Sequence, residues 1–240
     1  MEMPPLDEMR PPRVAALLRE LPNLALIWSS PVRPVRLDRA ACEGRANSPV
    51  LVLPGILSAD PATSHMRRTL RASGYYAYAS RLGVVTGVTP ALFERARARL
   101  EEVHARHQAP VTLIGISLGG LYARVLAQRH PEMVGLVITL GTPFSGDRRA
   151  NNAWRIYEAL NDHTVDNPPL PDNPSAKPPA RTIAIWSRND GIIAPACSRG
   201  NEGERDLAIE VPERHFEFSA SRRSIARVLQ VLAEHAPPHA

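Results

Sequence analysis

A serine, Ser117, stands in the stretch GISLGG (115–120), with one glycine two residues before it and another two residues after it. This G-x-S-x-G pattern is weak evidence by itself, because glycine and serine are common. Its context is stronger, since an apolar stretch, VTLIGI (111–116), precedes it and a helix-prone stretch, LGGLYARVLAQRH (118–130), follows it. A strand-to-helix turn of this kind strains the backbone of its serine and exposes the hydroxyl. We therefore predict that Ser117 is a nucleophile.

The neighbours of Ser117 fit the same role. Side chains at Gly115 and Gly119 would collide with nearby backbone in so tight a turn. The helix that starts after Ser117 directs free N–H groups and the positive end of its dipole toward the attacked carbonyl. The tetrahedral intermediate of acyl transfer needs two donors for its oxyanion, and the backbone N–H of Leu118 is predicted to be one of them.

The second oxyanion donor is expected in the loop after the apolar stretch PVLVLPG (49–55). Gly55 permits a close approach of the backbone at that point. Ile56 would offer its N–H, and Leu57 is the alternative donor. Pro54-Gly55 also serves as an ordinary chain turn, and the two interpretations are compatible.

A nucleophilic serine needs a base, and the base needs an acid that orients it. In this architecture the acid and the histidine follow the serine along the chain in that order. Asp190 ends the apolar stretch RTIAIWSRND (181–190), and His215 follows DLAIEVP (206–212), so both are expected in loops at the edge of the sheet. We predict a catalytic triad of Ser117, Asp190 and His215.

Other titratable residues are weaker candidates for these roles. Glu213 is close to His215 in sequence but is expected to point away from it. His65 follows the loop after the first strand, where it lies on the surface or lines the pocket. The remaining candidates are expected in an insertion, on helix faces or ends, or near the C-terminus: Asp162, His163, Asp166, His104, His107, His130, His235 and His239.

The elements that must position these residues alternate along the chain. Apolar runs predict strands at 49–55, 75–83, 111–117, 134–143, 181–190 and 206–212. Helical spacing and end signals predict helices at 64–74, 90–108, 118–130 and 224–235, the second capped by Thr89. This alternation predicts an α/β fold with a mostly parallel central sheet and helices on both of its faces.

The N-terminal segment, 1–48, carries no recognisable motif. It includes the apolar, helix-prone stretch VAALLRELPNLALIW (14–28), which Pro22 should kink or split. We expect residues 1–48 to form a helical or irregular segment, followed by the main domain at 49–240.

An insertion at about 144–180 interrupts the alternation. It holds a short amphipathic stretch, NNAWRIYEAL (151–160), and then a run too rich in proline for a helix or a strand. An insertion after a strand of an open α/β sheet overhangs the ligand crevice, so we predict a short lid. The predicted lining of the substrate pocket is Leu57, His65, Phe144 and Trp154. A cleft for an apolar acyl group could be formed by the stretch 14–28 together with Trp154, Ile156 and Tyr157.

The composition restricts partners and location. The formal net charge is +5, and Lys177 is the only lysine among 29 basic residues. Arginines are spread among glutamates, as in FERARARLEEVHARH (93–107), so we expect no nucleic-acid partner. We expect no metal, no cofactor and no membrane span, because no ligand cluster is evident and no apolar run reaches about 18 residues. Without signal-peptide features we expect a cytoplasmic protein, with Cys42 and Cys197 as buried thiols.

These motifs together resemble the α/β-hydrolase superfamily, bacterial lipases and esterases in particular, over roughly residues 49–235. The resemblance rests on LPGIL (53–57), GISLGG (115–120), LGTPFSG (140–146), SRNDGII (187–193) and RHF (214–216). The oxyanion loop departs from it, because many lipases have His-Gly where this chain has Pro54-Gly55. The resemblance implies the same triad and an esterase or lipase activity.

The expected reaction is hydrolysis of a small carboxylic ester through an acyl-enzyme. Its rate is expected to rise with pH as the His215 imidazole becomes neutral, near the ordinary histidine pKa of roughly 6.5. Two alternatives remain open. One is an acyltransferase or thioesterase with the same triad, and the other is a non-catalytic binding protein with the same fold.

Overall fold

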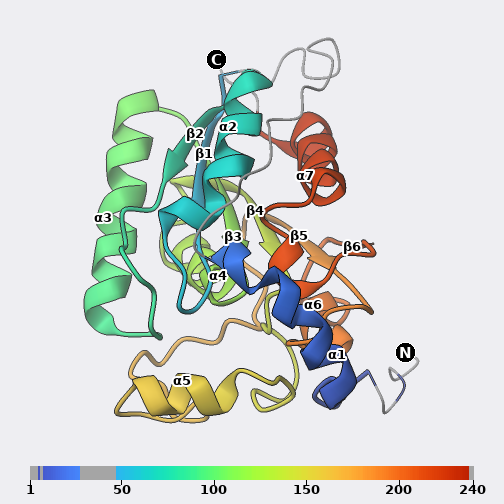
Figure 1. Ribbon diagram of the computed structural model, residues 1–240. Helices are drawn as coiled ribbons and strands as arrows, with labels where there is room; N and C mark the ends of the chain where they lie inside the picture. Colours follow the sequence, from blue (N-terminus) through green and yellow to red (C-terminus); the bar gives the residue numbers. More distant parts are fainter. Residues whose placement is uncertain (1–4, 6–7, 28–46, 238–240) are drawn as a thin grey trace.

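Six parallel strands form the central sheet (Figure 1). The computed structural model describes residues 5, 8–27 and 47–237 of the 240-residue chain. Within these residues the strand order is β2-β1-β3-β4-β5-β6, and every neighbouring pair is parallel. The strands are β1 (Pro49–Leu53), β2 (Tyr76–Ala79), β3 (Val111–Ile116), β4 (Val134–Leu140), β5 (Arg181–Trp186) and β6 (Leu207–Glu210).

Helices cover both faces of this sheet, which confirms the predicted fold class. α2 (Ser64–Ala72) and α7 (Arg222–His235) pack on one face, and α3 (Pro90–His107) and α4 (Leu118–Arg129) pack on the other. The shorter elements are α1 (Val14–Glu20), η1 (Leu21–Ile27), η3 (Asp60–Thr63), α5 (Trp154–Leu160), α6 (Pro195–Arg199) and η4 (His215–Glu217).

The strands form where the sequence is continuously apolar, and every residue of β1 and β3 is buried. Parallel strands between two helical layers bury both faces, which is why the runs do not alternate with polar residues. All six predicted strands run past the observed C-terminal ends. β2 stops at Ala79 because the Asp60 carboxylate accepts the N–H groups of Ser80 and Arg81. β4 stops at Leu140 because Gly141, with a φ of 55°, turns the chain.

Local signals define the helices. The Thr89 hydroxyl accepts the N–H of Leu92 at 3.2 Å, which confirms the predicted cap of α3. Pro22 splits the N-terminal stretch as expected, because it has no N–H to continue the helix. α1 therefore ends at Glu20, and the chain continues as the 3₁₀ helix η1.

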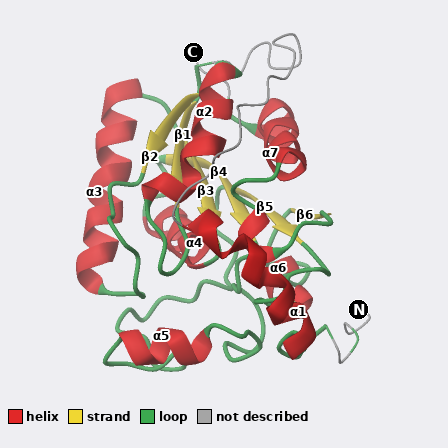
Figure 2. Ribbon diagram, viewed as in Figure 1, coloured by secondary structure: helices red, strands yellow, loops and turns green. Residues whose placement is uncertain are grey.

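The insertion between β4 and β5 lies beyond the ends toward which the strand arrows point (Figure 2). Buried Arg124 of α4 holds its base by donating to the carbonyls of Pro174, Ser175 and Ala176. The guanidinium also lies over the ring of Phe144, 4.0 Å from its centroid. Burial lowers the pKa of Arg124 to about 10, which still leaves the side chain charged at neutral pH. The predicted lid is thus tied at its base to α4.

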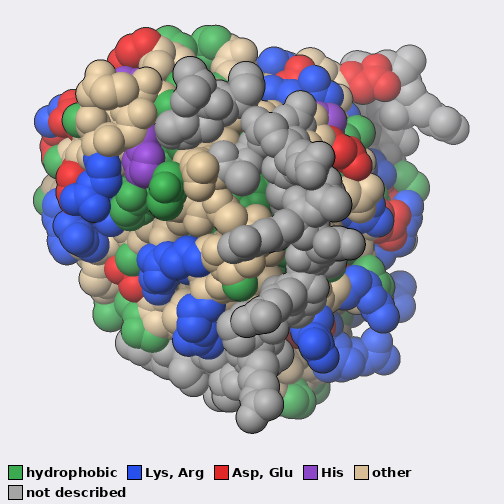
Figure 3. Space-filling view, turned by 90° about the horizontal axis from the view of Figure 1, so that it is seen from above, with side chains coloured by type: hydrophobic (Ala, Val, Ile, Leu, Met, Phe, Trp, Pro, Cys, Tyr) green, Lys and Arg blue, Asp and Glu red, His purple; other side chains and the backbone are tan. Residues whose placement is uncertain are grey.

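Basic side chains occupy several separate places on the face seen from above, a number of them beside acidic ones (Figure 3). On α3, for example, Arg97 pairs with Glu94 at 2.8 Å and also with Glu101. Such pairs along a solvated helix contribute little to stability, because water screens their charges.

The structure also bears on membrane-spanning helices and on the cysteines. Among the described residues no helix combines the length and the apolar character needed to cross a membrane. Cys197 is a buried free thiol, as predicted, and burial raises its pKa to about 11. Cys42 lies outside the described residues.

Candidate active site

Ser117 occupies the turn between β3 and α4 with a strained backbone. Its φ of 50° and ψ of −121° lie outside the regions that residues with a side chain normally adopt. The N–H of Ser117 donates to the Leu140 carbonyl at 2.8 Å, and its own carbonyl accepts the N–H of Gly120 at 2.9 Å. Strain of this kind persists where surrounding contacts enforce it, as at functional sites.

The glycines on either side of Ser117 are required by the tightness of this turn. A Cβ on Gly115 would come within 2.3 Å of the Gly120 Cα, and a Cβ on Gly119 within 2.4 Å of the Leu53 carbonyl oxygen. Neither contact can be relieved by a side-chain movement, because both involve backbone atoms. The predicted collisions are therefore confirmed.

The loop after β1 lies directly against Ser117, since a Cβ on Gly55 would be 3.2 Å from the Ser117 Cβ. The N–H of Leu57 donates to the Val85 carbonyl at 2.7 Å and is engaged within the loop. This leaves Ile56 as the predicted second oxyanion donor. The first predicted donor, Leu118, begins α4, so its N–H is not needed within the helix.

Asp190 and His215 come together at the carboxyl ends of β5 and β6, and both are buried. The Nδ1 of His215 lies 2.8 Å from the Oδ2 of Asp190. The other carboxylate oxygen, Oδ1, accepts the N–H groups of Ile192 and Ile193, each at 2.8 Å. The predicted acid and base are in contact. Ser117 follows β3 at the same edge of the parallel sheet, and its hydrogen bond to His215 stays a prediction.

No protein-family model matches the sequence, and no curated protein matches it significantly. Solved structures do match. A monoacylglycerol lipase of Paleococcus ferrophilus gives a TM-score of 0.57 at 16% identity, covering 80% of this chain and 97% of the lipase. The metagenomic carboxylesterase EstE1 gives 0.56 at 14% identity over 79% of both chains. The pyrethroid hydrolase PytH gives 0.54 at 18% identity, over 80% of this chain and 99% of that one.

The chain adopts the α/β-hydrolase fold. At these identities the likeness establishes the fold and leaves the reaction to be argued from the site. The three residues of the predicted triad, Ser117, Asp190 and His215, stand after β3, β5 and β6. This is the chain order on which the prediction rests.

The imidazole of His215 is buried within the protein. The rings of Phe216 and Phe218 stand edge-on to it, with centroids 5.6 and 6.2 Å away. Burial disfavours the charged imidazole, but the charge and hydrogen bond of Asp190 and the charge of Glu20 outweigh it. The pKa of His215 is therefore raised above its ordinary 6.5. The sequence expectation of a value near 6.5 is corrected upward.

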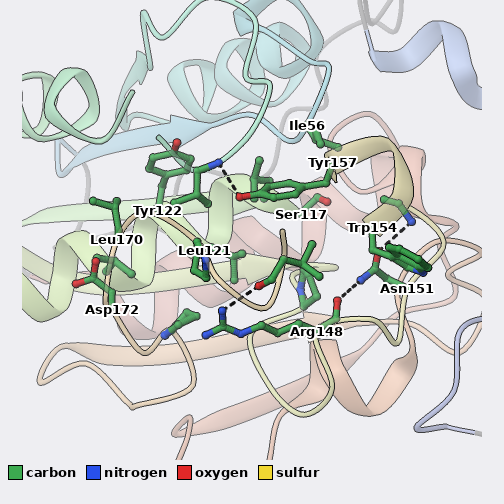
Figure 4. A pocket seen from close by; sticks show the side chains of 18 of the residues that line it. Ile56, Ser117, Leu121, Tyr122, Arg148, Asn151, Trp154, Tyr157, Leu170 and Asp172 are labelled. Atoms are coloured by element: carbon green, nitrogen blue, oxygen red, sulfur yellow. Dashed lines mark hydrogen bonds between the residues drawn. The ribbon is translucent and has the colours of Figure 1, made fainter. Parts of the chain in front are cut away.

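An apolar cavity of about 130 Å³ lies beside Ser117 (Figure 4). Leu118, Leu121 and Tyr122 of α4 line it together with Trp154, Tyr157 and Leu170 of the insertion. The Tyr157 hydroxyl accepts the N–H of Val88 at 3.2 Å and contacts the Nε2 of His163 at 2.8 Å. These contacts hold Tyr157 in place as one wall of the cavity. The insertion therefore supplies part of the pocket lining.

The charged groups of the cavity are already engaged. Arg148 donates to the Val165 carbonyl at 2.9 Å, and Asp172 forms a salt bridge with Arg129 at 2.7 Å. Asp172 is therefore neutralised by its partner, whereas Arg148 keeps its charge at an exposed position. The rest of the wall is mainly hydrocarbon and aromatic. In the described part of the chain, no three His, Cys, Asp or Glu side chains are grouped so that they could hold a metal.

Of the four predicted pocket residues, Trp154 lines the cavity, whereas Leu57, His65 and Phe144 do not. Phe144 is buried beneath Arg124, and His65 is fully buried within α2, so its alternative surface location is wrong too. Ile156, expected in the acyl cleft, is 48% exposed. Position along the chain indicated that the loop after β1 and the insertion line the cavity, but not which of their side chains face it.

Glu20 is a residue of this site that the sequence did not single out. It comes from α1, yet its carboxylate contacts the backbone of both loops that carry the acid and the base. The only available signal was a lone glutamate inside the apolar stretch 14–28, where it could equally have faced solvent. Glu213, by contrast, bonds Ser221 and points away from His215 as expected.

Proposed function

We propose that this α/β-hydrolase cleaves carboxylic esters through an acyl-enzyme intermediate. The observation that carries the proposal is the buried 2.8 Å contact between Asp190 and His215, at the sheet edge where Ser117 stands on a strained turn. A base oriented by an acid, next to a turn that presents a hydroxyl, is what serine-based acyl transfer requires.

In the proposed reaction, the Nε2 of His215 takes the proton of Ser117 while Oγ attacks the ester carbonyl. The N–H groups of Leu118 and Ile56 hold the resulting oxyanion. The imidazolium, stabilised by Asp190, gives its proton to the departing alcohol. Water, deprotonated by His215, then attacks the acyl carbon, and collapse of that intermediate releases the carboxylic acid and restores Ser117.

The cavity favours a short, apolar acyl group. Its 130 Å³ is close to the roughly 150 Å³ of an apolar cavity known to hold benzene, so it has room for about four to six carbons. Leu118, Leu121 and Trp154 offer such a chain apolar contact. Two of the similar structures are named a monoacylglycerol lipase and a carboxylesterase, which supports an ester as the substrate class.

A series of p-nitrophenyl esters from acetate to palmitate tests this proposal. We expect kcat/KM to rise with each methylene that enters the cavity, because burying one contributes about 0.8 kcal/mol. It should reach its highest value at butyrate or hexanoate and gain nothing more up to palmitate, because the further methylenes stay in water. Trp154→Ala should move the optimum to longer chains. Ile156→Ala, on the exposed side of α5, is the matched control and should leave it unchanged.

If the folded protein hydrolyses none of these esters, the proposed function is wrong. A maximum at palmitate would contradict the short acyl cavity. Acyl thioesters of the same chain lengths, run in parallel with and without an added alcohol, would identify a thioesterase or an acyltransferase by faster turnover or by ester formation.

The pH dependence of kcat/KM should report the raised pKa of His215. Neutral imidazole is the form that accepts the Ser117 proton, so activity rises with pH through the pKa of His215 in the free enzyme. Because that pKa lies above 6.5, the midpoint of the rise should also lie above 6.5. Initial rates with a short ester, measured between about pH 5 and 9, give this midpoint. A midpoint below 6.5 would contradict the environment described for His215.

A further inference from the structure

Glu20, the last residue of α1, binds the loops of both Asp190 and His215. Its Oε1 accepts the N–H of Gly191 at 2.9 Å and the N–H of His215 at 2.8 Å, and its Oε2 accepts the N–H of Phe216 at 3.4 Å. The residue is only 1% exposed. A carboxylate withdrawn from water needs such donors, and these come from the two segments that meet at the candidate site.

Close packing holds the helix that carries Glu20 against the Asp190 loop. A Cβ on Gly191 would come within 2.4 Å of the Ala16 carbonyl oxygen, so α1 touches that loop where it has no side chain. Asn152 of the insertion donates to the carbonyls of both Gly191 and Pro12, at 2.8 and 3.0 Å. The position of Glu20 is therefore enforced by α1 and by the insertion.

A second contact joins α1 to the His215 segment. Arg214 donates through its guanidinium to the Arg19 carbonyl at 3.0 Å. The backbone just before Glu20 is thus fixed to the segment that its carboxylate binds.

We propose that Glu20 is a positioning residue that sets the separation and alignment of Asp190 and His215. One oxygen atom bridges residue 191, next to the acid, and residue 215, the base itself. A shift of either loop must break a hydrogen bond to a buried charge. Losing such a bond costs more free energy than losing a hydrogen bond between two neutral groups. The inference rests on the proposed function, because alignment of this pair matters for a reaction that uses it.

The charge of Glu20 also faces the imidazole. The ionisable groups around His215 are Asp190 after β5 and Glu20 at the end of α1, while Glu213 bonds Ser221 and Arg214 bonds the Arg19 carbonyl. A nearby negative charge favours the imidazolium. Removing the charge of Glu20 while keeping an oxygen in its place should therefore lower the pKa of His215.

Two variants separate geometry from charge. Glu20→Ala removes both acceptor oxygens and the three hydrogen bonds that they accept. We expect kcat for a short ester to fall about 10- to 100-fold, with KM changed less than about threefold, because the reacting groups are misplaced. Glu20→Gln keeps a carbonyl oxygen for Gly191 and His215. It should restore kcat to within about threefold of wild type at alkaline pH and move the acidic limb of the pH profile to lower pH.

The control is Glu213→Gln, which neutralises another buried carboxylate two residues before His215 that contacts Ser221 instead. Its kcat and pH profile should match those of wild type. A folded Glu20→Ala enzyme with wild-type kcat would overturn the inference. So would equal losses in Glu20→Ala and Glu20→Gln with an unmoved pH profile, since that result describes a purely structural role. If Glu20→Ala does not fold, the pH profile of Glu20→Gln tests the inference instead, and an unmoved acidic limb would overturn it.

A measurement without turnover separates this inference from the proposed function. NMR titration of the His215 imidazole should give a lower pKa in Glu20→Gln than in wild type, and no such change in Glu213→Gln. If wild type hydrolyses no ester but the pKa shifts as expected, the proposed function fails while the contact of Glu20 with the acid–base pair stands. If wild type is active and neither kcat nor the pKa responds to Glu20, only the positioning role fails.

Discussion

Replacing Ser117 with alanine should lower kcat/KM for a short-chain ester by about 10⁶-fold, the loss typical of a serine hydrolase without its nucleophile. The substitution removes Oγ, the atom that would carry the acyl group. It leaves the cavity, the predicted oxyanion donors and the Asp190–His215 pair in place. Initial rates with p-nitrophenyl butyrate and labelling by a fluorophosphonate probe measure the effect, and wild type but not Ser117→Ala should be labelled.

Ser73→Ala is the matched control for this experiment. It also removes a buried serine hydroxyl, one that donates to the Thr69 carbonyl at the far end of α2. Its activity and labelling should equal those of wild type. Turnover or labelling of Ser117→Ala at wild-type levels would contradict the assignment of the nucleophile. A folded wild-type protein that resists the probe would favour a non-catalytic binding protein.

The second large effect is expected from Asp190→Asn, which should lower kcat about 10⁴-fold, as the loss of the orienting carboxylate does in serine hydrolases. Oδ2 of Asp190 accepts the proton on Nδ1 of His215. An amide nitrogen in that place would donate to Nδ1 and drive the proton to Nε2, the nitrogen that must accept from Ser117. The remaining amide oxygen can still accept the N–H groups of Ile192 and Ile193, so the loop should keep its shape.

Asp206→Asn is the control for this second substitution. Asp206 accepts the N–H of Thr182 at 2.7 Å and pairs with Lys177 at 3.1 Å, at the opposite end of β5 from Asp190. Its kcat, measured at a pH above the pKa of His215, should stay close to that of wild type. If Asp190→Asn kept more than about a tenth of the wild-type kcat, another group would have to orient His215.

The strained turn at Ser117 could be predicted because its causes lie within a few residues. An apolar run, two glycines and a helix-prone stretch define a strand, a turn and a helix without reference to the rest of the chain. The placement of Asp190 and His215 at one sheet edge followed similarly, because parallel strands end at the same side. Their contact of 2.8 Å agrees with that expectation.

The strand ends and most of the pocket could not be predicted in this way. β2 ends early because Asp60, 20 positions before Ser80 in the chain, takes the N–H groups that would continue it. Phe144 points under Arg124 instead of into the cavity, where its ring lies against a buried guanidinium that also donates to several carbonyls. Such outcomes depend on which side chains pack together in three dimensions.

The sequence by itself determined the alternation of strands and helices, the position of the Ser117 turn and the order of its two predicted partners, because periodicity and turn chemistry act over short distances. Only the tertiary structure decided the cavity, the direction of the His215 pKa shift and the role inferred for Glu20. Glu20 and His215 are 195 positions apart, and their contact exists because α1 packs against the Asp190 loop. A buried charge acts through its neighbours in space, and those neighbours are known only once the chain has folded.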